Sequence, residues 1–474
     1  MTGNKYPLST QLCINGKLVD SHSSERYSLF NPVDDSLFCD QVQYAAAEDV
    51  DAAVEAAEAA FKGPWRKFTA TQRGEALVKL SALILEHKEE LAYLDGTPTG
   101  KTAAITEAEF AASILRYYAG WADKYPGESY PGEDGMVKIV RQEPLGVCVG
   151  INPWNGPIAI MAMKLGPALA MGNVIILKPS EKTPLASNRL AFLASESGIL
   201  PPGVFQSLSG AGATGAMLAS HMRVRKVSFT GSIPTGKKIQ EAAAKSNLKR
   251  VTLELGGKSP SGIFEDCDFD NAVWWSVFAI TQNTGQACYA ASRVYVQEGI
   301  ADKFVEAFTK GMSEKINELA PLADKTQLSR VSSFFQRDAG KTQILVGGKQ
   351  HGDKGCYWEP TVFYNPEKDA QVYNEEIFGP VACISTFKDE EEFLRLANDT
   401  EYGLMAGVFT QDINRAMRIS SELDSGVVGI NCVSTISLQT PFGGSKQSGI
   451  GREMSHYALR SYSEPKTVLI NMNY

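Results

Sequence analysis

The sequence predicts an α/β protein with two doubly wound parallel-sheet domains and a small β arm. Short β-branched runs alternate with segments of helical periodicity, which is the rhythm of βαβ units in a parallel sheet. This alternation occurs in two successive stretches of the chain. With 474 residues, the chain is also too long for one compact core.

The N-terminal part is expected to be rich in helix. Residues 48–62 begin with acidic side chains and repeat small apolar residues at helical spacing, and residues 71–93 show the same periodicity. Acidic groups favour the positive end of a helix dipole. We therefore expect helix over both segments.

The first sheet is predicted within residues 145–256. Its strands are the runs GVCVGI, NVIILK, GVFQSL, RKVSFT and RVTLEL, with helices through MAMKLGPALAMG and from near Thr235. The second sheet is predicted from SRVYVQE, ACISTFK, GVFTQD and GVVGINC, with helices over 301–318, 389–398 and 413–421.

Two segments fit neither sheet. Residues 125–142 contain Pro–Gly turns typical of a hairpin, and residues 460–474 form a tail with a β-branched run. Each could be an arm that contacts a neighbouring subunit or a hairpin packed on its own chain.

The composition argues against several classes of function. Hydrophobic and charged fractions of 43% and 21% are ordinary for a folded globular protein. A formal charge of −8 without a long Lys/Arg run argues against nucleic acid or an acidic membrane as a partner. No run of about 20 apolar residues occurs, and the start MTGNKYPLST lacks the build of a secretory signal. The expected location is the cytoplasm.

Cysteine and histidine patterns give no sign of a metal site. The eight cysteines contain no CxxC pair and are interpreted as reduced thiols. The five histidines form no HxH or HExxH group, so neither a zinc site nor a Ser-His-Asp triad is predicted.

Two glycine-containing segments could hold phosphate. Residues 210–215 (GAGATG) match GxGxxG, but residues 230–240 contain no acid to hold a ribose, so a loop is the preferred interpretation. In SFTGSIPTG, Gly231 and Gly236 lie between a strand and a helix, and Ser232 adds a hydroxyl. An ordinary strand-to-helix turn explains this second segment equally well.

Two residues are candidates for chemistry at a reacting carbon. Glu254 interrupts an apolar strand, and burial there would raise its pKa toward that of a general base. The alternative is an outward-facing residue of an alternating strand. Cys288 lies in a polar, glycine-bearing loop that suits a nucleophile, although a buried inert thiol is the alternative.

Three further polar residues follow predicted strands. Asn155, in INPWNGP, could donate to a developing oxyanion or could serve only the turn. Lys178 and Glu181, in KPSEKTP, lie where open α/β sheets bind ligands, but they could equally be solvated charges.

These segments occur in the order of the successive signatures of the aldehyde dehydrogenase superfamily. The motifs are INPWNGP, ILKPSEKTP, FTGSIPTG, ELGGKSP, NTGQACYA, EEIFGPV and PFGGSKQSGIGRE, and Glu254 precedes Cys288 by 34 residues, as in the family. The resemblance covers essentially the whole chain. It implies two Rossmann-like domains that act on an aldehyde with NAD(P), without metal, in a homodimer or homotetramer.

The resemblance also implies residue roles. Cys288 would be the nucleophile, Asn155 and the Cys288 backbone N–H the oxyanion hole, and Glu254 the base. The cofactor would lie near nine residues, with Lys178 and Glu181 at the adenosine ribose. These are Trp154, Lys178, Glu181, Gly231, Ser232, Gly236, Leu255, Glu376 and Phe378.

Domain ranges follow from the same resemblance. We expect an NAD(P)-binding domain of residues 1–124 and 143–255, a catalytic domain of residues 256–445, and an oligomerisation arm of residues 125–142 and 460–474.

The substrate tunnel is expected to be largely apolar. Seven residues align with its wall: Phe110, Gly156, Ile160, Met163, Tyr289, Ile436 and Phe442. Gly156 and Met163 stand where many members have an aromatic residue and a Trp, so the wall should be wider. We expect a medium or bulky apolar or aromatic aldehyde. Glu181 should repel a 2′-phosphate, so NAD is preferred and NADP is possible.

Two other functions remain open. The same thiol, oxyanion hole and base could hydrolyse activated esters or thioesters without a cofactor. A structural protein that has lost catalysis is the second alternative, and the presence of Cys288, Glu254 and Asn155 argues against it.

Overall fold

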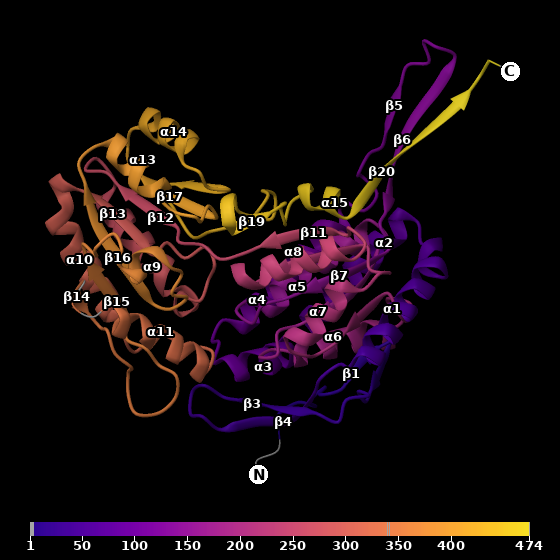
Figure 1. Cartoon of the computed structure of the whole chain (residues 1–474), viewed down its shortest axis with the longest axis horizontal. Helices are drawn as coiled ribbons and strands as arrows, with labels where there is room; N and C mark the ends of the chain where they lie inside the picture. Colours follow the sequence, from indigo (N-terminus) through magenta and orange to yellow (C-terminus); the bar gives the residue numbers. More distant parts are fainter. Residues whose placement is uncertain (1–3, 339, 341, 474) are drawn as a thin grey trace.

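The computed structural model describes residues 4–338, 340 and 342–473. Two α/β bodies lie side by side, and a narrow three-stranded arm projects from one of them (Figure 1). Each body is built on one large, mainly parallel sheet. The predicted fold class, two α/β units and a β arm, is confirmed.

The first sheet has the strand order β19-β11-β10-β7-β8-β9-β1-β2. Its five central strands are parallel, and their continuous apolar runs are typical of strands covered on both faces. They are β7 (Val147–Ile151), β8 (Val174–Lys178), β9 (Phe205–Ser207), β10 (Lys226–Thr230) and β11 (Arg250–Glu254). All five were predicted from these runs.

The edges of this sheet are antiparallel additions that the sequence pattern did not predict. β1 (Leu12–Ile14) and β2 (Lys17–Val19) extend one edge, and β19 (Gly449–Ile450) pairs with the end of β11 at the other. Strands of two or three residues are too short to display a period. β19 also lies outside all the predicted domain ranges.

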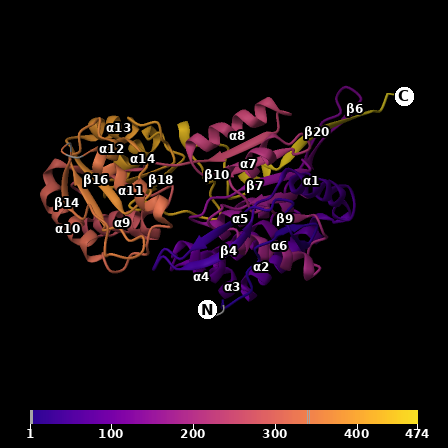
Figure 2. The ribbon, with the colours of Figure 1, turned by 60° about the horizontal axis from the view of Figure 1, so that its bottom comes forward.

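Helices from the N-terminal part of the chain and helices that alternate with the central strands pack around the first sheet (Figures 1 and 2). They are α1 (Ala47–Lys62), α2 (Ala70–Glu86), α3 (Lys88–Gly96), α4 (Ala104–Ala119), α5 (Pro157–Ala170), α6 (Leu185–Glu196), α7 (Gly212–Ser220) and α8 (Ile233–Lys245), with the short turns η1 (Trp65–Lys67) and η2 (Thr97–Thr99). A hairpin of β3 (Arg26–Phe30) and β4 (Leu37–Gln43) lies beside them.

Two predictions in this region need correction. The helix expected over 71–93 is two helices, because the backbone of His87 leaves the helical conformation between α2 and α3. The loop expected at 210–215 is only partly a loop, because α7 begins at Gly212. Burial of Leu218 and Ala219 stabilises a helix that glycine propensity alone disfavours.

The second sheet has the order β14-β15-β16-β13-β12-β17-β18 and is parallel except for β14. Its strands are β12 (Pro260–Ile263), β13 (Arg293–Gln297), β14 (Gln343–Val346), β15 (Thr361–Tyr364), β16 (Val381–Phe387), β17 (Met405–Phe409) and β18 (Val427–Ile430). Its helices are α9 (Phe269–Thr281), α10 (Ala301–Glu314), α11 (Lys325–Arg337), α12 (Gln371–Asn374), α13 (Glu390–Asn398) and α14 (Ile413–Glu422), with η3 (Gln282–Gly285) and η4 (Glu298–Ile300). The helix expected over 301–318 ends at Glu314, and a turn follows.

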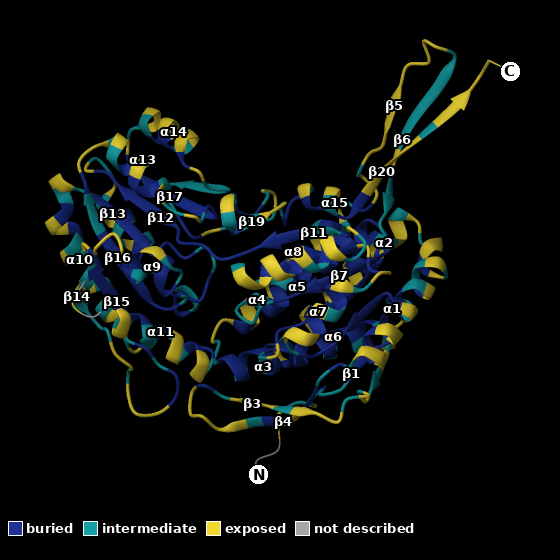
Figure 3. Ribbon diagram, viewed as in Figure 1, coloured by how far each residue is buried: buried dark blue, intermediate teal, exposed yellow. Residues whose placement is uncertain are grey.

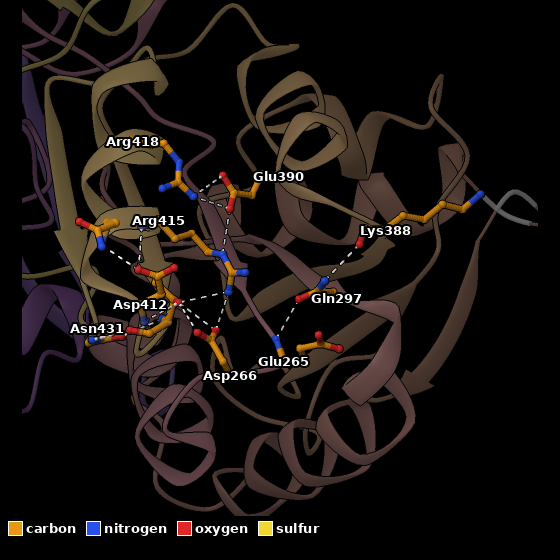
Figure 4. Close-up of polar contacts among 11 residues, drawn as sticks. Glu265, Asp266, Gln297, Lys388, Glu390, Asp412, Arg415, Arg418 and Asn431 are labelled. Atoms are coloured by element: carbon orange, nitrogen blue, oxygen red, sulfur yellow. Dashed lines mark hydrogen bonds and ion pairs between the residues drawn. The ribbon is translucent and has the colours of Figure 1, made fainter.

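Charged side chains join the outer helices of the second body (Figure 4). Arg415 of α14 donates to Asp266 at 2.9 Å and to Glu390 of α13 at 3.0 Å, and Arg418 donates to the same Glu390 at 2.9 Å. These groups are partly exposed, so each pair contributes little stability, but together they fix the position of α14 against α13.

The arm contains β5 (Glu128–Tyr130), β6 (Met136–Pro144) and β20 (Ser463–Asn471). β20 pairs antiparallel with β6 from Ser463 opposite Pro144 to Asn471 opposite Met136. The two segments that fitted neither sheet therefore form one sheet. The arm lies away from the body and is exposed over much of its surface (Figure 3), so it is not a hairpin packed on its own chain.

The two bodies meet where the central strands of the first sheet end. The chain passes from β11 to β12 through residues 255–259, and it returns through residues 431–448, η5 (Lys446–Ser448) and β19 before α15 (Tyr457–Ser461). The backbone N–H of Leu255 donates to the carbonyl of Ser448 at 2.9 Å. The carboxyl ends of β7, β10 and β11 thus border the junction, which is where open α/β sheets bind ligands.

Candidate active site

A cavity between the two bodies contains the residues predicted to carry the chemistry. Its lining comes from the ends of three strands of the first sheet and from the Cys288 loop, α11 and the segment after α12. The lining residues are Pro153, Trp154, Asn155, Thr230, Gly231, Ser232, Glu254, Gly256, Cys288, Gln327, Arg330, Glu376 and Phe378. All three predicted catalytic residues are among them.

Cys288 is held by an unusual turn. Asn283, Thr284 and Gly285 have φ values of 47°, 57° and 69°, a left-handed run that a β-branched residue rarely adopts. The hydroxyl of Thr284 donates to the carbonyl of Ala320 at 2.9 Å. A Cβ on Gly285 would lie 2.0 Å from the carbonyl oxygen of Gly379, so only glycine fits there. The turn is fixed by the Thr284 hydrogen bond and by the close packing of Gly285. The half-buried Cys288 that follows it lines the cavity.

Glu254, the last residue of β11, is 3% exposed and is not the outward-facing residue of an alternating strand. Among the described residues its Oε1 has no hydrogen-bond partner. Burial raises the pKa of this carboxyl to about 8, and the negative charge of Glu453 adds to the effect. The neighbouring Cys288 side chain and the charge of Lys164 oppose it. Glu254 is therefore a carboxyl group that exchanges a proton near neutral pH.

The Cys288 thiol and the Glu254 carboxyl line the same cavity, and each affects the pKa of the other. Burial, followed by the adjacent Glu254 carboxylate, holds the pKa of the Cys288 thiol well above its usual value. The thiol is therefore protonated at neutral pH. An ionised Glu254 is the neighbouring group that can accept its proton.

Asn155 lies in the turn between β7 and α5. Its Nδ2 donates to the backbone carbonyl of Gln286 at 2.9 Å, and that carbonyl also accepts from Nδ2 of Asn283 at 3.1 Å. A side-chain amide has two N–H donors. One donor of Asn155 is used by Gln286, which fixes the orientation of the amide, and the second can point into the cavity.

The start of α8 fits a phosphate group. Ser232 is the N-cap, its side chain bonds to the Thr235 hydroxyl at 3.0 Å, and no side chain caps the helix. Backbone N–H groups at an uncapped helix N-terminus attract anions. Gly231 lines the cavity, while Gly236 packs against Leu255 in the first turn.

Glu376 and Phe378 form another wall. The N–H of Gly257 donates to Glu376 at 3.1 Å, while burial raises the pKa of Glu376 to about 7. Phe378 has a φ of 62°, and its carbonyl accepts from Gln327 at 2.7 Å. Its ring meets the edge of the Trp154 ring with centroids 5.4 Å apart. A carboxyl and two aromatic rings fit a sugar and a flat heterocycle.

Lys178 and Glu181 lie at the carboxyl end of β8, next to β7. Lys178 is buried, which lowers its pKa, while Glu181 is half-exposed with its Oε2 3.8 Å from Lys178 Nζ. An ammonium and a carboxylate at this edge fit ribose hydroxyls. The predicted cofactor residues therefore suit a dinucleotide that extends from this edge toward Cys288.

None of the seven predicted substrate residues lines this cavity. The ring of Tyr289, the residue after Cys288, is perpendicular to the ring of Phe442, with centroids 5.9 Å apart. A Cβ on Gly156 would lie 3.3 Å from Ile160. Phe110 and Ile436 are half-buried and Met163 is buried. These residues remain a prediction for the substrate side.

Several cavity or neighbouring residues were missed. Gln327 and Arg330 on α11 resembled an ordinary polar helix face, and Arg330 donates to the carbonyl of Glu376 at 2.8 Å. The buried pair of Lys164 and Glu453, 2.6 Å apart, had a visible signal, because Lys164 is the one charge in the apolar run MAMKLGPALAMG. A second charged pair, Lys101 and Glu107, contacts the Asn155 turn.

The described part of the chain contains neither a candidate metal cluster nor a candidate membrane-spanning helix. No group of three or more His, Cys, Asp or Glu side chains there could hold a metal ion. No helix there is both long and apolar enough to cross a membrane.

Fold and site together define a nucleotide-binding α/β protein with a cysteine and a carboxyl group in one cavity. A sequence model of the aldehyde dehydrogenase family matches residues 18–468. An aldehyde dehydrogenase of Davidiella tassiana is 44% identical over 99% of this chain and 96% of its own length. The chain belongs to the aldehyde dehydrogenase family, and it is an oxidoreductase that acts on aldehydes.

Solved structures agree with this assignment. An indole-3-acetaldehyde dehydrogenase of P. syringae, solved with NAD+ and IAA, has a TM-score of 0.95 at 34% identity and covers 98% of this chain and 97% of its own. PnpE with nicotinamide adenine dinucleotide has a TM-score of 0.94 at 40% identity, with 98% of each chain covered. These similarities support a nicotinamide cofactor.

Proposed function

We propose that this enzyme oxidises a medium or bulky apolar or aromatic aldehyde to its carboxylic acid, with NAD as the preferred hydride acceptor. Cys288 is the nucleophile, Glu254 the base, and Asn155 with the backbone N–H of Cys288 the oxyanion hole. The observation that carries the proposal is the single cavity that is lined by Cys288, the buried Glu254 carboxyl and Asn155.

The first step is addition of sulfur to the aldehyde. Cys288 gives its proton to ionised Glu254, and the thiolate forms a bond to the carbonyl carbon. The negative charge that develops on the carbonyl oxygen is stabilised by the free N–H of Asn155 and the backbone N–H of Cys288. The product is a thiohemiacetal on Cys288.

A nicotinamide cofactor bound in this cavity would supply the hydride acceptor that oxidation of the thiohemiacetal to a thioester requires. This chain's role is to hold that group close to Cys288. Glu376, Phe378 and Trp154 would border the nicotinamide half, Gly231, Ser232, Gly236 and Leu255 the diphosphate, and Lys178 with Glu181 the adenosine ribose.

The second half of the reaction releases the acid. Glu254 first releases to solvent the proton that it took from Cys288. The ionised carboxylate then removes a proton from water, the water oxygen attacks the thioester carbon, and the carbon–sulfur bond breaks, so that the Cys288 thiolate leaves and can take the proton back from Glu254. Glu254 is suited to this role because its pKa of about 8 lies near neutral pH. The same carboxyl thus serves both steps.

The cofactor preference rests on Glu181. Its carboxylate can accept hydrogen bonds from ribose hydroxyls and would repel an added 2′-phosphate. Lys178 is 3.8 Å from it and weakens that repulsion, so NADP remains a slower alternative. Equal catalytic efficiency with both dinucleotides would contradict this preference.

The substrate class rests on the apolar residues near Cys288. Tyr289 and Phe442 offer aromatic rings, and Ile160 packs closely against Gly156, which has no side chain. Lys101, the nearby cation, is already paired with Glu107. Higher kcat/KM for benzaldehyde or long alkanals than for succinic semialdehyde is the expected result, and the reverse order would refute it.

The arm supports a homodimer or homotetramer. Its strands present exposed apolar side chains, including Tyr130, Leu469, Ile470 and Met472, on a sheet that projects from the body. A cytoplasmic location is part of the same proposal, supported by a relative named "Aldehyde dehydrogenase, cytosolic 1" from Macroscelides proboscideus, 43% identical over 98% of this chain.

The decisive experiment follows NADH formation with a panel of aldehydes, using the wild-type protein and Cys288→Ala. Production of NADH by the wild type alone supports the proposal. Hydrolysis of activated esters without NADH from any aldehyde would favour a thiol esterase. Equal NADH formation by Cys288→Ala would overturn the role of Cys288.

A further inference from the structure

The Asn155 turn is held by two charged residues that belong to another element. Glu107, in the first turn of α4, and Lys101, just before α4, form an ion pair whose side chains are 8% and 14% exposed. This pair lies against the start of α5 and the backbone of Asn155. It has no part in the chemical steps described above.

The start of α5 lacks a cap of its own. Its N-cap is Gly156, which has no side chain, and its first residue is Pro157. The next two N–H groups, of Ile158 and Ala159, are those that an N-cap side chain normally accepts from. Oε1 of Glu107 accepts both, at 2.9 Å and 3.1 Å. Glu107 therefore caps α5 from a different helix, and its negative charge is favoured at that end of the helix.

Lys101 continues this connection to the turn. Its Nζ contacts Oε2 of Glu107 and donates to the backbone carbonyl of Asn155 at 2.8 Å. The same carbonyl accepts from Nδ2 of Asn283 at 3.2 Å. The peptide of Asn155 is thus held from the α4 side by Lys101 and from the Cys288 loop by Asn283.

We propose that Lys101 and Glu107 are positioning residues that hold the Asn155 turn so that its amide meets the oxyanion formed at Cys288. This inference rests on the proposed function and deepens it. Loss of the Lys101 donor leaves the Asn155 carbonyl with one neutral partner, and loss of the Glu107 charge removes the partner of Lys101. A displacement of about 1 Å in such a group lowers rates by about a hundredfold.

The test uses Lys101→Met and Glu107→Gln, with Lys88→Met and Glu109→Gln as matched controls. Lys88 and Glu109 form a 2.6 Å ion pair on the same stretch of chain, but they are partly exposed and outside the site. We expect kcat for aldehyde oxidation to fall about tenfold to a hundredfold in Lys101→Met and less in Glu107→Gln, which keeps an acceptor oxygen. The Kd for NAD and the rates of the control variants should be unchanged.

A double-mutant cycle separates positioning from general stability. In an Asn155→Ala background, assayed with more enzyme, Lys101→Met should cause little further loss, because both changes act on one donor. An equal loss in both backgrounds would overturn the inference. Lys101→Arg should restore most of the rate, and it remains informative if Lys101→Met folds poorly.

Two outcomes distinguish this inference from the proposed function. If the wild type forms no NADH, the proposed function itself is refuted. If the wild type forms NADH and Lys101→Met is fully active, only the positioning role of Lys101 and Glu107 is refuted.

Discussion

Glu254 and Glu453 are both buried carboxyls near the same cavity, but their partners differ. Each has one oxygen without a partner among the described residues, Oε1 of Glu254 and Oε2 of Glu453. Glu254 is 3% exposed and has no ion-pair partner there, whereas Glu453 is 4% exposed and its Oε1 accepts from Lys164 at 2.6 Å and from Ser228 at 2.7 Å. The unpaired carboxyl has a pKa raised to about 8 and can exchange protons. The paired carboxyl contacts the buried Lys164 ammonium. Equal burial therefore accompanies a raised pKa at one carboxyl and an ion pair at the other.

The largest expected effect is on catalysis at Glu254. Glu254→Gln should lower steady-state kcat by about 10² to 10⁴-fold, because no base remains to activate water. Thermal stability should be unchanged or higher, since the variant removes a buried group that burial disfavours in its charged form. Steady-state NADH formation and a thermal melt measure the two quantities. A kcat within about threefold of the wild type would mean that another group is the base.

The complementary change is Glu453→Gln, which leaves the Lys164 ammonium buried without its anion. Removing one partner of a buried pair typically costs about 3–5 kcal/mol of unfolding free energy. Denaturant unfolding should show this loss. The double variant Lys164→Met/Glu453→Leu should recover much of it, because no uncompensated charge remains. If Glu453→Gln were as stable as the wild type, the ion pair between Lys164 and Glu453 would not contribute to the free energy of unfolding.

Glu254 should also make stability and activity depend on pH. Between pH values of about 4.5 and about 8, Glu254 is protonated in the folded enzyme but ionised in the unfolded chain, so folding stability falls as pH rises through this window. Glu254→Gln should flatten that decline. The kcat of the wild type should rise over the upper part of the window as Glu254 ionises. A kcat that is constant from pH 6 to about pH 9 would contradict the role of Glu254 as base.

A smaller effect is expected at a carboxylate that is not buried. Glu181 has a half-exposed side chain, so solvent screens its repulsion of a 2′-phosphate. Glu181→Gln should raise the ratio of kcat/KM for NADP to that for NAD by about fivefold to tenfold. Cofactor titrations with one saturating aldehyde measure this ratio. A ratio that does not change would exclude Glu181 as the discriminating group.

The strands that were predicted correctly could be recognised from short runs of neighbouring residues. The runs VCVGI and VIIL are continuous and apolar, and KVSFT is rich in β-branched residues, so their strands could be recognised without partners. β19 could not, because it depends on contacts with residues far along the chain. β19 is two residues long and pairs with β11 only after the chain returns from the second body.

The candidate site divides in the same way. Cys288, Glu254 and Asn155 were predicted because their motifs are distinctive in order and spacing. Lys101, Glu107 and Arg330 were not, because each looks like a solvated charge on a polar helix or loop. Their importance comes from the groups they contact, and those contacts join residues tens to more than fifty positions apart.

The sequence by itself determined the α/β class, the family signatures and the chemical types of the reacting groups, because these depend on residue identity and short-range spacing. The tertiary structure decided that Glu254 is buried with its Oε1 unpartnered, that Glu453 is buried against Lys164, and that Glu107 caps a helix whose own N-cap is glycine. A pKa and an amide orientation are set by the surrounding dielectric, charges and hydrogen bonds. Those surroundings exist only once distant segments have packed together.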